Sequence, residues 1–544
     1  MLVESATVTV VRAITVAAGV FAPGHLGGLT PFLPFDLVDA VLAETGRVQQ
    51  RLRVLPSRVV VYFVIALGLF PNLGYALVWD KLVAELIEAG LTVPKPAESA
   101  LRDARRRVGP GPFKALFEVL AGPLARPDTP GVSYRSLRTV AFDGCASFKA
   151  ADTTAQHHWL GRIRSKLGWA GYPQLMLMAL VETGTRGLIG VRFGPIGEGG
   201  ETGYAGKLLH LLTRDMLLLA DRGFADTGFL KAAATRAHLL VRISRSRRPS
   251  VDTPLPDGSY LTNFDGLTLR IIEATITTTT STGDVLHAEY RLATTLTDHH
   301  THHATTLLRL YHERWEIESA FYALRHTLFH GRVLRSATPD GLQQELWALL
   351  ILYQLLRAAM TEASEHQPGT DPDRAGFTIA LQHAHNQVIN AAGILPDPHR
   401  HTPARIGTAA TNTLGDRRDR TSKRVLKTPV ARYAKPHPDD PRPTTSTTIT
   451  TRTHTINART HTPPPRPRPE RGIPTGQLTH TILNYLNTHP DQPRTIQQTA
   501  QHTGHDPTKT RHKLNDMTKK GYITRTSPGH YALPSTPLTT TPPP

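Results

Sequence analysis

The apolar positions of the chain change their spacing along its length. From about residue 34 to 120 they recur at helical intervals, and the run Val59–Phe70 predicts a buried helix. This run is shorter than the roughly 20 residues that span a bilayer. After Pro130, short apolar runs alternate with helical stretches, which is typical of an α/β domain. The pattern therefore predicts an all-helical domain over residues 1–130 and an α/β domain over residues 131–365.

Two acidic residues follow predicted strands of the α/β domain. Thr139–Phe142 leads into Asp143, and Met216–Ala220 leads into Asp221, with a glycine-containing turn after each acid. The carboxyl ends of sheet strands are where α/β proteins usually form their sites. A single Asp in such a position more often only caps the next element. Asp143 and Asp221 are candidate site residues because the chain contains more than one such acid. Further strands are predicted over 175–181, 187–192 and 238–243.

The rest of this domain is predicted to hold a β-rich insertion and two helices. Residues 244–297 are rich in Thr, and their Asp-Gly pairs are typical of hairpin turns. A long helix is expected from about Thr305 to Phe329 and a second, buried helix from Leu342 to Ala359. The insertion would separate the core strands from the long helix.

Polar side chains recur on one face of that long helix. Tyr311, Arg314, Glu318 and Arg325 are spaced by three, four and seven residues, which places them within an arc of roughly 60° on an ideal α-helix. Such a group suits a phosphate-handling, metal-binding site, because guanidinium groups bind phosphate oxygens and carboxylates bind Mg²⁺. An Arg and Glu pair at this spacing is also an ordinary helix-stabilising contact. The spacing alone therefore leaves both interpretations open.

Past residue 365 the composition changes to Pro, Thr, Arg and His. Residues 366–475 predict a flexible basic linker, because a segment with few large apolar residues cannot offset its ordering entropy. Residues 476–534 follow a pattern of three short helices and two strands, which predicts a winged-helix-like DNA-binding domain, and residues 535–544 predict a disordered tail. The candidate recognition helix carries Lys509, Arg511, His512 and Lys513.

The charge and cysteine content narrow the class of protein. A formal net charge of +18 favours a polyanionic partner such as nucleic acid. The single cysteine, Cys145, excludes an intramolecular disulfide and suits a reducing cytosol. We expect no membrane segment. The charge, the cysteine content and the three acids together indicate a metal-dependent enzyme that acts on DNA.

At this point the motifs, taken in order, resemble the insertion-sequence-four family of bacterial DDE transposases. Tyr311, Arg314, Glu318 and a basic residue seven positions later are spaced as in the family signature, although the family usually has Lys where this chain has Arg325. The remaining matches lie upstream: residues 34–82 resemble the family's N-terminal domain, and Asp143-Gly144 and Leu219–Phe224 resemble its two acidic motifs. The resemblance covers about residues 25–360.

The resemblance implies an α/β fold with a ribonuclease-H-like mixed sheet as its core, and a cut-and-paste reaction. In that reaction the DNA is nicked, the freed 3′-hydroxyl forms a hairpin, and the reopened ends are joined to target DNA. Asp143, Asp221 and Glu318 would hold two Mg²⁺ ions, with Mn²⁺ as an alternative ion. Tyr311, Arg314 and Arg325 would bind phosphates of the DNA end. The family also implies a homodimer on paired terminal inverted repeats, in the bacterial cytoplasm and associated with the nucleoid.

Some questions stay open at the level of sequence. A family aromatic that stacks on a flipped base could be Tyr260, Phe264 or Tyr290. A metal-dependent nuclease on the same core would share every motif. An inactive or domesticated DNA-binding protein is a third hypothesis, which the intact set of acids disfavours.

Overall fold

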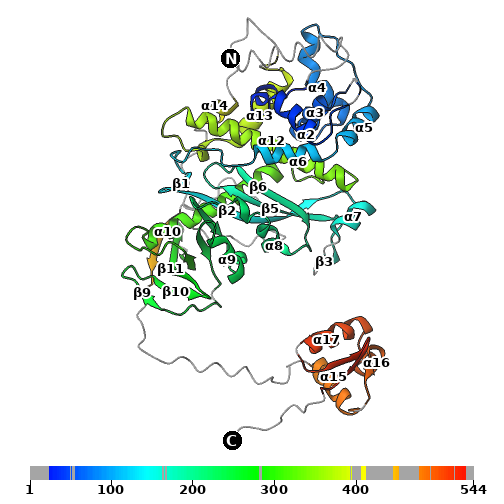
Figure 1. Cartoon of the computed structure of the whole chain (residues 1–544), viewed down its shortest axis with the longest axis vertical. Coiled ribbons are helices and arrows are strands. Elements are labelled where there is room, and N and C mark those ends of the chain that lie inside the picture. The colour runs from blue at the N-terminus through cyan, green and yellow to red at the C-terminus, as the bar shows by residue number, and fades with distance from the viewer. Residues whose placement is uncertain are drawn as a thin grey trace. The chain divides into compact units, whose positions relative to one another are not determined.

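The computed structural model describes most of the chain and divides it into two compact units, residues 1–456 and 457–544 (Figure 1). Described are residues 24–49, 51, 55–161, 164–165, 168–244, 246–280, 285–392, 394, 406–411, 414, 445–452, 477–490, 492–519 and 521–534. The predicted tail over 535–544 and most of the segment between 395 and 476 lie outside this set.

The first unit begins with helices packed around one apolar element. In α3, Ser57–Leu69, nearly every side chain is buried, which confirms the predicted core helix. The Tyr62 hydroxyl in α3 donates a hydrogen bond to the Leu33 carbonyl at 2.6 Å, so this buried polar group is satisfied. The other elements here are η1 (Gly27–Phe32), α2 (Phe35–Glu44), α4 (Tyr75–Glu88), α5 (Glu98–Val108) and α6 (Gly111–Leu120).

A large mixed sheet follows, in the order β6-β5-β2-β7-β8-β12-β11-β10-β9. Strands β7 and β8 run parallel to β2, whereas β5 is antiparallel to both of its neighbours. The strands of its first half are β2 (Leu137–Lys149), β5 (Gln174–Glu182), β6 (Leu188–Pro195), β7 (Met216–Ala220) and β8 (His238–Arg242). The smaller elements among them are β1 (Ser133–Tyr134), α7 (Thr154–Leu160), β3 (Arg164–Ser165), β4 (Gly168–Trp169), α8 (Gly200–Gly206), η2 (Leu209–Leu211), η3 (Arg222–Phe224) and α9 (Thr227–Ala234).

Alternate side chains of these strands bury into two separate cores. Ala141, Leu217 and Leu219 join the core shared with the N-terminal helices and α12 (Pro339–Glu365). Phe142 and Leu218 join the core under α8 and α9, on the opposite face. This alternation is the period of a pleated strand, and Figure 1 shows the helices on both sides of the sheet. The fold is therefore a mixed α/β sheet between two helical layers.

The predicted insertion is continuous with this sheet. Strand β12 (Val285–Thr294) pairs with β8, so the hairpin strands extend the core sheet instead of forming a separate layer. The other strands of the insertion are β9 (Thr253–Pro254), β10 (Tyr260–Phe264) and β11 (Leu267–Thr280). Helix α12 closes the unit and is, among the described residues, the one helix long and apolar enough to cross a membrane. Inside the fold, 89% of its most apolar stretch is buried.

The predicted linker over residues 366–475 is ordered in several places, and the prediction was wrong there. The described elements are η6 (Pro372–Arg374), α13 (Phe377–Ile389), α14 (Ile406–Ala410) and β13 (Thr445–Thr451). Helix α13 buries Phe377, Leu381 and Val388 in the main core, and β13 pairs antiparallel with β11. Average composition concealed these elements, because a short apolar stripe or a run of β-branched residues is enough once a partner surface exists.

The second unit contains three helices and a small antiparallel sheet. The helices are α15 (Gln477–Asn487), α16 (Ile496–Thr503) and α17 (Pro507–Lys519), and the strands are β14 (Arg494–Thr495), β15 (Thr524–Ser527) and β16 (His530–Ala532). Strand β16 lies between β14 and β15. Ile482, Leu486, Leu514, Met517 and Tyr531 form its core. The three predicted helices are present, but β14 was not predicted, and β15 lies at Thr524–Ser527, later than the predicted strand.

Candidate active site

The strand register brings Asp143 and Asp221 to the same level of the sheet. The last parallel pair between β2 and β7 joins Ala141 to Leu219, and each acid lies two residues further on. Because side chains alternate along a strand, Asp143 points to the same face as Ala141, toward the core that contains the long apolar helices. Strand β7 ends at Ala220, but β2 continues to Lys149, so the predicted end of β2 before Asp143 was wrong.

Both Asp side chains also accept hydrogen bonds from nearby backbone amides. The Asp143 carboxylate accepts a hydrogen bond from the Gly144 amide at 2.9 Å. The Asp221 carboxylate accepts one from the Gly223 amide at 2.6 Å and caps η3. The other oxygen of Asp143, Oδ2, lies 3.8 Å from Arg314 Nη1.

The helix predicted from Thr305 to Phe329 is broken into four consecutive pieces. These are α10 (Ala304–Leu310), a 3₁₀ turn η4 (Tyr311–Trp315), α11 (Glu316–Tyr322) and a π-helical segment η5 (Ala323–Leu328). A 3₁₀ turn is tighter than an α-helix and a π turn is wider, so the single arc predicted for the four polar residues does not hold. Such irregular turns are frequent at functional sites.

Arg314 lies between two of the candidate acids. Its Nη1 is 3.8 Å from Asp143 Oδ2, and its Nη2 is 3.6 Å from Glu318 Oε1. The Arg314 side chain is 9% exposed, whereas the two carboxylates are 19% and 25% exposed. The guanidinium therefore joins the helical segment to strand β2 and offsets the repulsion between two half-buried carboxylates.

Tyr311 connects the same segment to strand β7. The tyrosine is buried, and its hydroxyl donates a hydrogen bond to the Ala220 carbonyl at 3.0 Å. Burial raises the pKa of the Tyr311 phenol well above its usual value, so the group is neutral. In this structure Tyr311 holds the residue next to Asp221, and its predicted phosphate contact stays a prediction.

Arg325 is not part of this cluster. It lies in η5, half-buried, and within the described residues no ion pair joins it to Asp143, Asp221 or Glu318. Its predicted contact with a DNA phosphate stays a prediction.

A fourth carboxylate, Glu201 of α8, approaches the two Asp residues from the other face of the sheet. A Cβ added at Gly144 would lie 2.9 Å from Glu201 Cγ, and one added at Gly223 would lie 3.6 Å from Glu201 Oε2. Burial, followed by the charges of Asp143 and Asp221, raises the pKa of the Glu201 carboxyl. Sequence reasoning missed this residue, because only the fold brings the glycine-rich segment before α8 to the strand ends.

The three candidates for base stacking differ in their burial. Tyr260 and Phe264 are buried in the core under α9. Tyr290 is half-buried, with its ring centroid 6.3 Å from that of Tyr311 and Arg242 positioned 4.3 Å above its face. Tyr290 is therefore the one of the three that lies beside the candidate site.

The acids are of the right chemical type for a hard divalent cation, because Mg²⁺ prefers carboxylate oxygens. In the part of the chain that the structure describes, however, no three acidic, His or Cys side chains lie close enough together to share a metal ion. Arg314 stands between Asp143 and Glu318 instead.

Comparison with known proteins places these motifs in a family. Residues 23–118 match the model of the insertion element 4 transposase N-terminal region, and residues 147–355 match that of the transposase DDE domain. The chain is 26% identical over 417 residues to the transposase InsG for insertion sequence element IS4 of Escherichia coli (strain K12), covering 74% of this chain and 92% of that one. The chain belongs to the IS4 family of DDE transposases.

Two of the three predicted acids lie inside the matched ranges. Asp221 and Glu318 lie inside the DDE match, and Asp143 lies four residues before it begins. Residues beyond 355 lie outside both family models. A cryo-EM structure of the piggyBac transposase synaptic complex with hairpin DNA is also similar, at a TM-score of 0.35 and 11% identity over 68% of this chain and 86% of that one. As a DDE transposase the chain is a DNA-cleaving and DNA-transferring enzyme, of a class that uses divalent metal ions.

Proposed function

We propose that this transposase carries out cut-and-paste transposition at the ends of its insertion sequence, with Asp143, Asp221 and Glu318 as catalytic acids. The observation that carries the proposal is that Arg314 lies near both Asp143 and Glu318, while Asp221, just beyond the neighbouring strand β7, lies at the same level as Asp143. The strand register supports the pairing of the two Asp residues, and Arg314 supports the placement of Glu318 beside them. A nick, a hairpin intermediate and strand transfer to target DNA form the proposed sequence.

The strand order supports a ribonuclease-H-like core. Numbered by their position in the chain, the first five core strands lie in the order 3-2-1-4-5, and only the second runs opposite to the others. The first and fourth of these strands carry Asp143 and Asp221. We propose that the domain boundaries are those predicted near residues 130 and 476, with the ordered stretches up to β13 belonging to the catalytic unit.

Two Mg²⁺ ions, or Mn²⁺ in their place, would be held by Asp143, Asp221 and Glu318 and would supply Lewis-acid activation of water and phosphate. Arg314 would move from the carboxylates to a non-bridging phosphate oxygen when DNA and metal bind, since a guanidinium binds both anions in the same way. Tyr311 and Arg325 are proposed to contact phosphates of the transposon end. Tyr290 is the best-placed side chain to stack on an unpaired base.

We further propose that the second unit is a winged-helix-like DNA reader. Its order of helix, strand, helix, helix, strand and strand supports this assignment, and Arg511 and His512 on α17 are exposed. The partner would be double-stranded DNA that carries the terminal inverted repeats, together with target DNA. A homodimer on paired ends, in the cytoplasm and associated with the nucleoid, completes the proposal.

The test is cleavage and joining of a labelled duplex that carries the element's own terminal repeat, in Mg²⁺ or Mn²⁺. We expect nicked, hairpin and joined products with the natural chain. Glu318→Gln should lower the rate at least about 100-fold, because electrostatic groups at reacting centres contribute on that order. Glu118→Gln, an exposed acid on α6, is the matched control and should leave the products unchanged.

Each outcome separates one hypothesis from the others. Nicking without joining would favour a nuclease on the same core. DNA binding without cleavage by any variant would favour an inactive or domesticated copy. Unchanged cleavage by Glu318→Gln would contradict the assignment of the third acid.

A further inference from the structure

A wide basic groove lies apart from the catalytic acids, between the N-terminal helices and the start of α12. Its volume is about 720 Å³. It shares no residue with the site formed by Asp143, Asp221, Arg314 and Glu318. Arginines dominate its lining, which contains Arg47, Arg102, Arg105, Arg106 and Arg335, against a single acid, Asp340.

Arg105 has a structural role, because its guanidinium is already hydrogen-bonded to side chains of the protein. Arg105 of α5 is 6% exposed and donates hydrogen bonds to Gln344 Oε1 at 2.5 Å, to the Tyr75 hydroxyl at 2.6 Å and to Ser336 Oγ at 2.6 Å. Its partners come from α4, from the loop before α12 and from α12 itself. The walls of the groove are therefore held at a fixed separation before any ligand binds.

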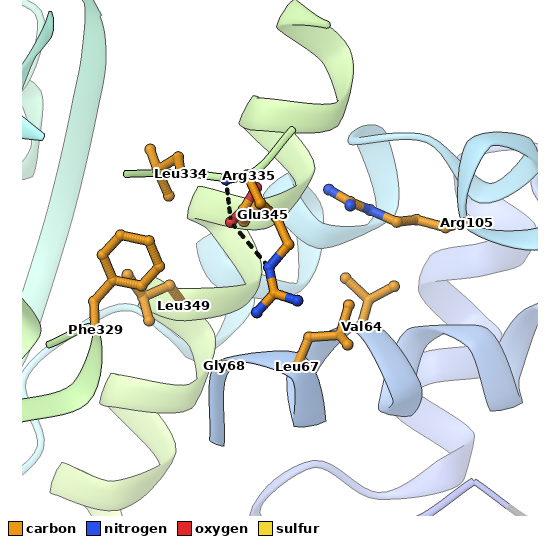
Figure 2. A pocket seen from close by; sticks show the side chains of 9 residues that line it. All are labelled: Val64, Leu67, Gly68, Arg105, Phe329, Leu334, Arg335, Glu345 and Leu349. Carbon is orange, nitrogen blue, oxygen red and sulfur yellow. Dashed lines mark hydrogen bonds and ion pairs between the residues drawn. The ribbon is translucent and has the colours of Figure 1, made fainter. Parts of the chain in front are cut away.

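Arg335 forms the opposite wall and is also held in place. Its guanidinium donates to the Leu73 carbonyl at 3.1 Å and the Pro71 carbonyl at 3.0 Å, and it lies 4.0 Å from Glu345. Figure 2 shows Arg335 and Arg105 beside a small apolar pocket lined by residues such as Leu67, Leu349 and Phe329. Glu345 also lines this pocket, and its carboxylate lies 4.0 Å from Arg335 Nε. Arg105 and Arg335 therefore support the groove, and the exposed arginines supply the charge that a ligand can reach.

The remaining arginines are exposed and available to a ligand. Arg106 lies 3.6 Å from Asp103 in a pair whose members are both about 70% exposed, a contact that contributes little in water. Within the described residues, Arg47 and Arg102 have no ion pair, and Arg47 donates only to the Arg107 carbonyl at 3.2 Å. The groove therefore presents more positive charge than its own acids neutralise.

The lining favours a phosphate backbone over a base or a nucleotide. Bases bound without sequence preference usually stack on aromatic side chains. Tyr75 is the one aromatic residue in the groove, and its hydroxyl is already bonded to Arg105. Guanidinium groups, by contrast, bind phosphate oxygens in a planar, often bidentate geometry.

The groove is connected to the strand that carries Asp143. The segment before Arg335 runs alongside the end of β2, where Leu334 donates its amide to the Lys149 carbonyl at 2.8 Å. Arg335 is also ten residues beyond Arg325 in the same connecting segment. A duplex held in the groove would thus be anchored on elements that continue into the catalytic acids.

We infer that this groove is a second DNA contact, which binds the sugar–phosphate backbone of duplex DNA without reading its sequence. The inference rests on the proposed function for the identity of the polyanion, but not on the three catalytic acids. It assigns a positioning role to Arg47, Arg102 and Arg106, and a supporting role to Arg105.

The test compares the full chain with Arg102→Ala/Arg106→Ala in the Glu318→Gln background, so that binding is measured without cleavage. Each lost phosphate contact should reduce the slope of log affinity against log salt by about 0.9, so two should reduce it by about 1.8. At about 0.15 M salt we expect at least a tenfold loss of affinity, equal for terminal-repeat and unrelated duplexes. The control variant is Arg214→Ala/Arg236→Ala, which also removes two positive charges. Both residues are exposed and lie before β7 and β8, so the slope should stay unchanged.

The outcomes are separable from those of the cleavage test. An unchanged slope, or equal losses of affinity in both double variants, would contradict DNA binding in the groove. Neither result would bear on Glu318-dependent cleavage. Competition by millimolar inorganic phosphate with no change in the DNA slope would identify a small-anion site instead. Because Arg102 and Arg106 are exposed, an unchanged melting temperature will show that the fold is preserved.

Discussion

The guanidinium of Arg314 can pair with carboxylates and can also bind a phosphate. This guanidinium lies near both Asp143 and Glu318. Removing it would take this positive charge away from two half-buried carboxylates. The same planar charge matches a phosphate. At the residue scale, therefore, the proposed site is arranged around the guanidinium of Arg314.

Tyr311 allows a prediction at this scale. Tyr311→Phe removes the hydrogen bond to the Ala220 carbonyl, which should cost about 1 kcal/mol of unfolding free energy. We expect the rate of strand cleavage to fall more than DNA affinity, because the lost contact positions the strand end beside Asp221. Chemical denaturation and single-turnover cleavage measure the two effects.

Tyr322→Phe is the matched control for this change. Its side chain is 64% exposed on the same segment, so neither stability nor cleavage should change. If Tyr311→Phe weakened DNA binding as strongly as it slowed cleavage, the predicted direct phosphate contact of Tyr311 would be favoured over the positioning role.

At the scale of elements, buried charges fix the catalytic segment to its surroundings. Glu316, two residues before Glu318, accepts a hydrogen bond from Arg186 at 2.6 Å, and Arg186 also pairs with Asp373 of η6. All three side chains are about nine-tenths buried. Burial lowers the pKa of Arg186, while the charge of Glu316 opposes that change. The network joins the turn between β5 and β6, the catalytic segment and a stretch that the sequence predicted to be a flexible linker.

Breaking this network should be costly. We expect Glu316→Gln to lower the unfolding free energy by about 1.5–3 kcal/mol, because Arg186 loses one of its two charged hydrogen-bonding partners. The triple variant Glu316→Gln/Arg186→Met/Asp373→Asn removes all three charges and should recover much of that loss. Asp80→Asn breaks an exposed ion pair with Lys95 and should cost less than about 1 kcal/mol.

Urea denaturation of these variants measures the effect. Equal losses for Glu316→Gln and Asp80→Asn would show that the network contributes nothing beyond surface charge. Cleavage by the triple variant then reports whether packing alone can position Glu318.

At the scale of the whole molecule, β13 brings a distant segment back to the insertion. Residues Thr445–Thr451 pair with Ala274–Thr280 of β11, and Arg452 then pairs with Glu289 of β12 at 2.7 Å. Without β13 this half of β11 would present an unpaired edge, which favours association between chains. The chain segment that leads to the second unit is thus attached to the strand pair that carries Tyr290.

Interrupting this strand gives the prediction at this scale. Ile449→Pro lies at the centre of the pairing with Ile276, and proline cannot donate a strand hydrogen bond. We expect faster amide exchange in β11 and β13, together with concentration-dependent association. Hydrogen exchange and light scattering detect these changes.

A matched substitution outside the paired residues is Arg452→Pro. It should have a smaller effect on exchange in β11, although its amide bond to the Glu273 carbonyl at 2.9 Å is lost. If Ile449→Pro left the exchange of β11 unchanged, β13 would not be a stable part of the sheet.

The sequence by itself determined the helical N-terminal region, the alternation of strands and helices that follows it, and the spacing of Tyr311, Arg314 and Glu318. These features are local, because hydrophobic periodicity and helical spacing depend on neighbouring residues alone. The family signature has the same local character, so the identity of the enzyme could be predicted without a structure.

Only the tertiary structure decided which residues share a space. Strand register places Asp143 and Asp221 at the same level of the sheet. The approach of Glu201 depends on how α8 packs over Gly144 and Gly223. The 3₁₀ and π turns around Glu318, the pairing of β13 and the basic groove likewise depend on contacts between segments far apart in the chain. Neither periodicity nor composition carries such information, since a contact between distant segments is fixed by the packing of both.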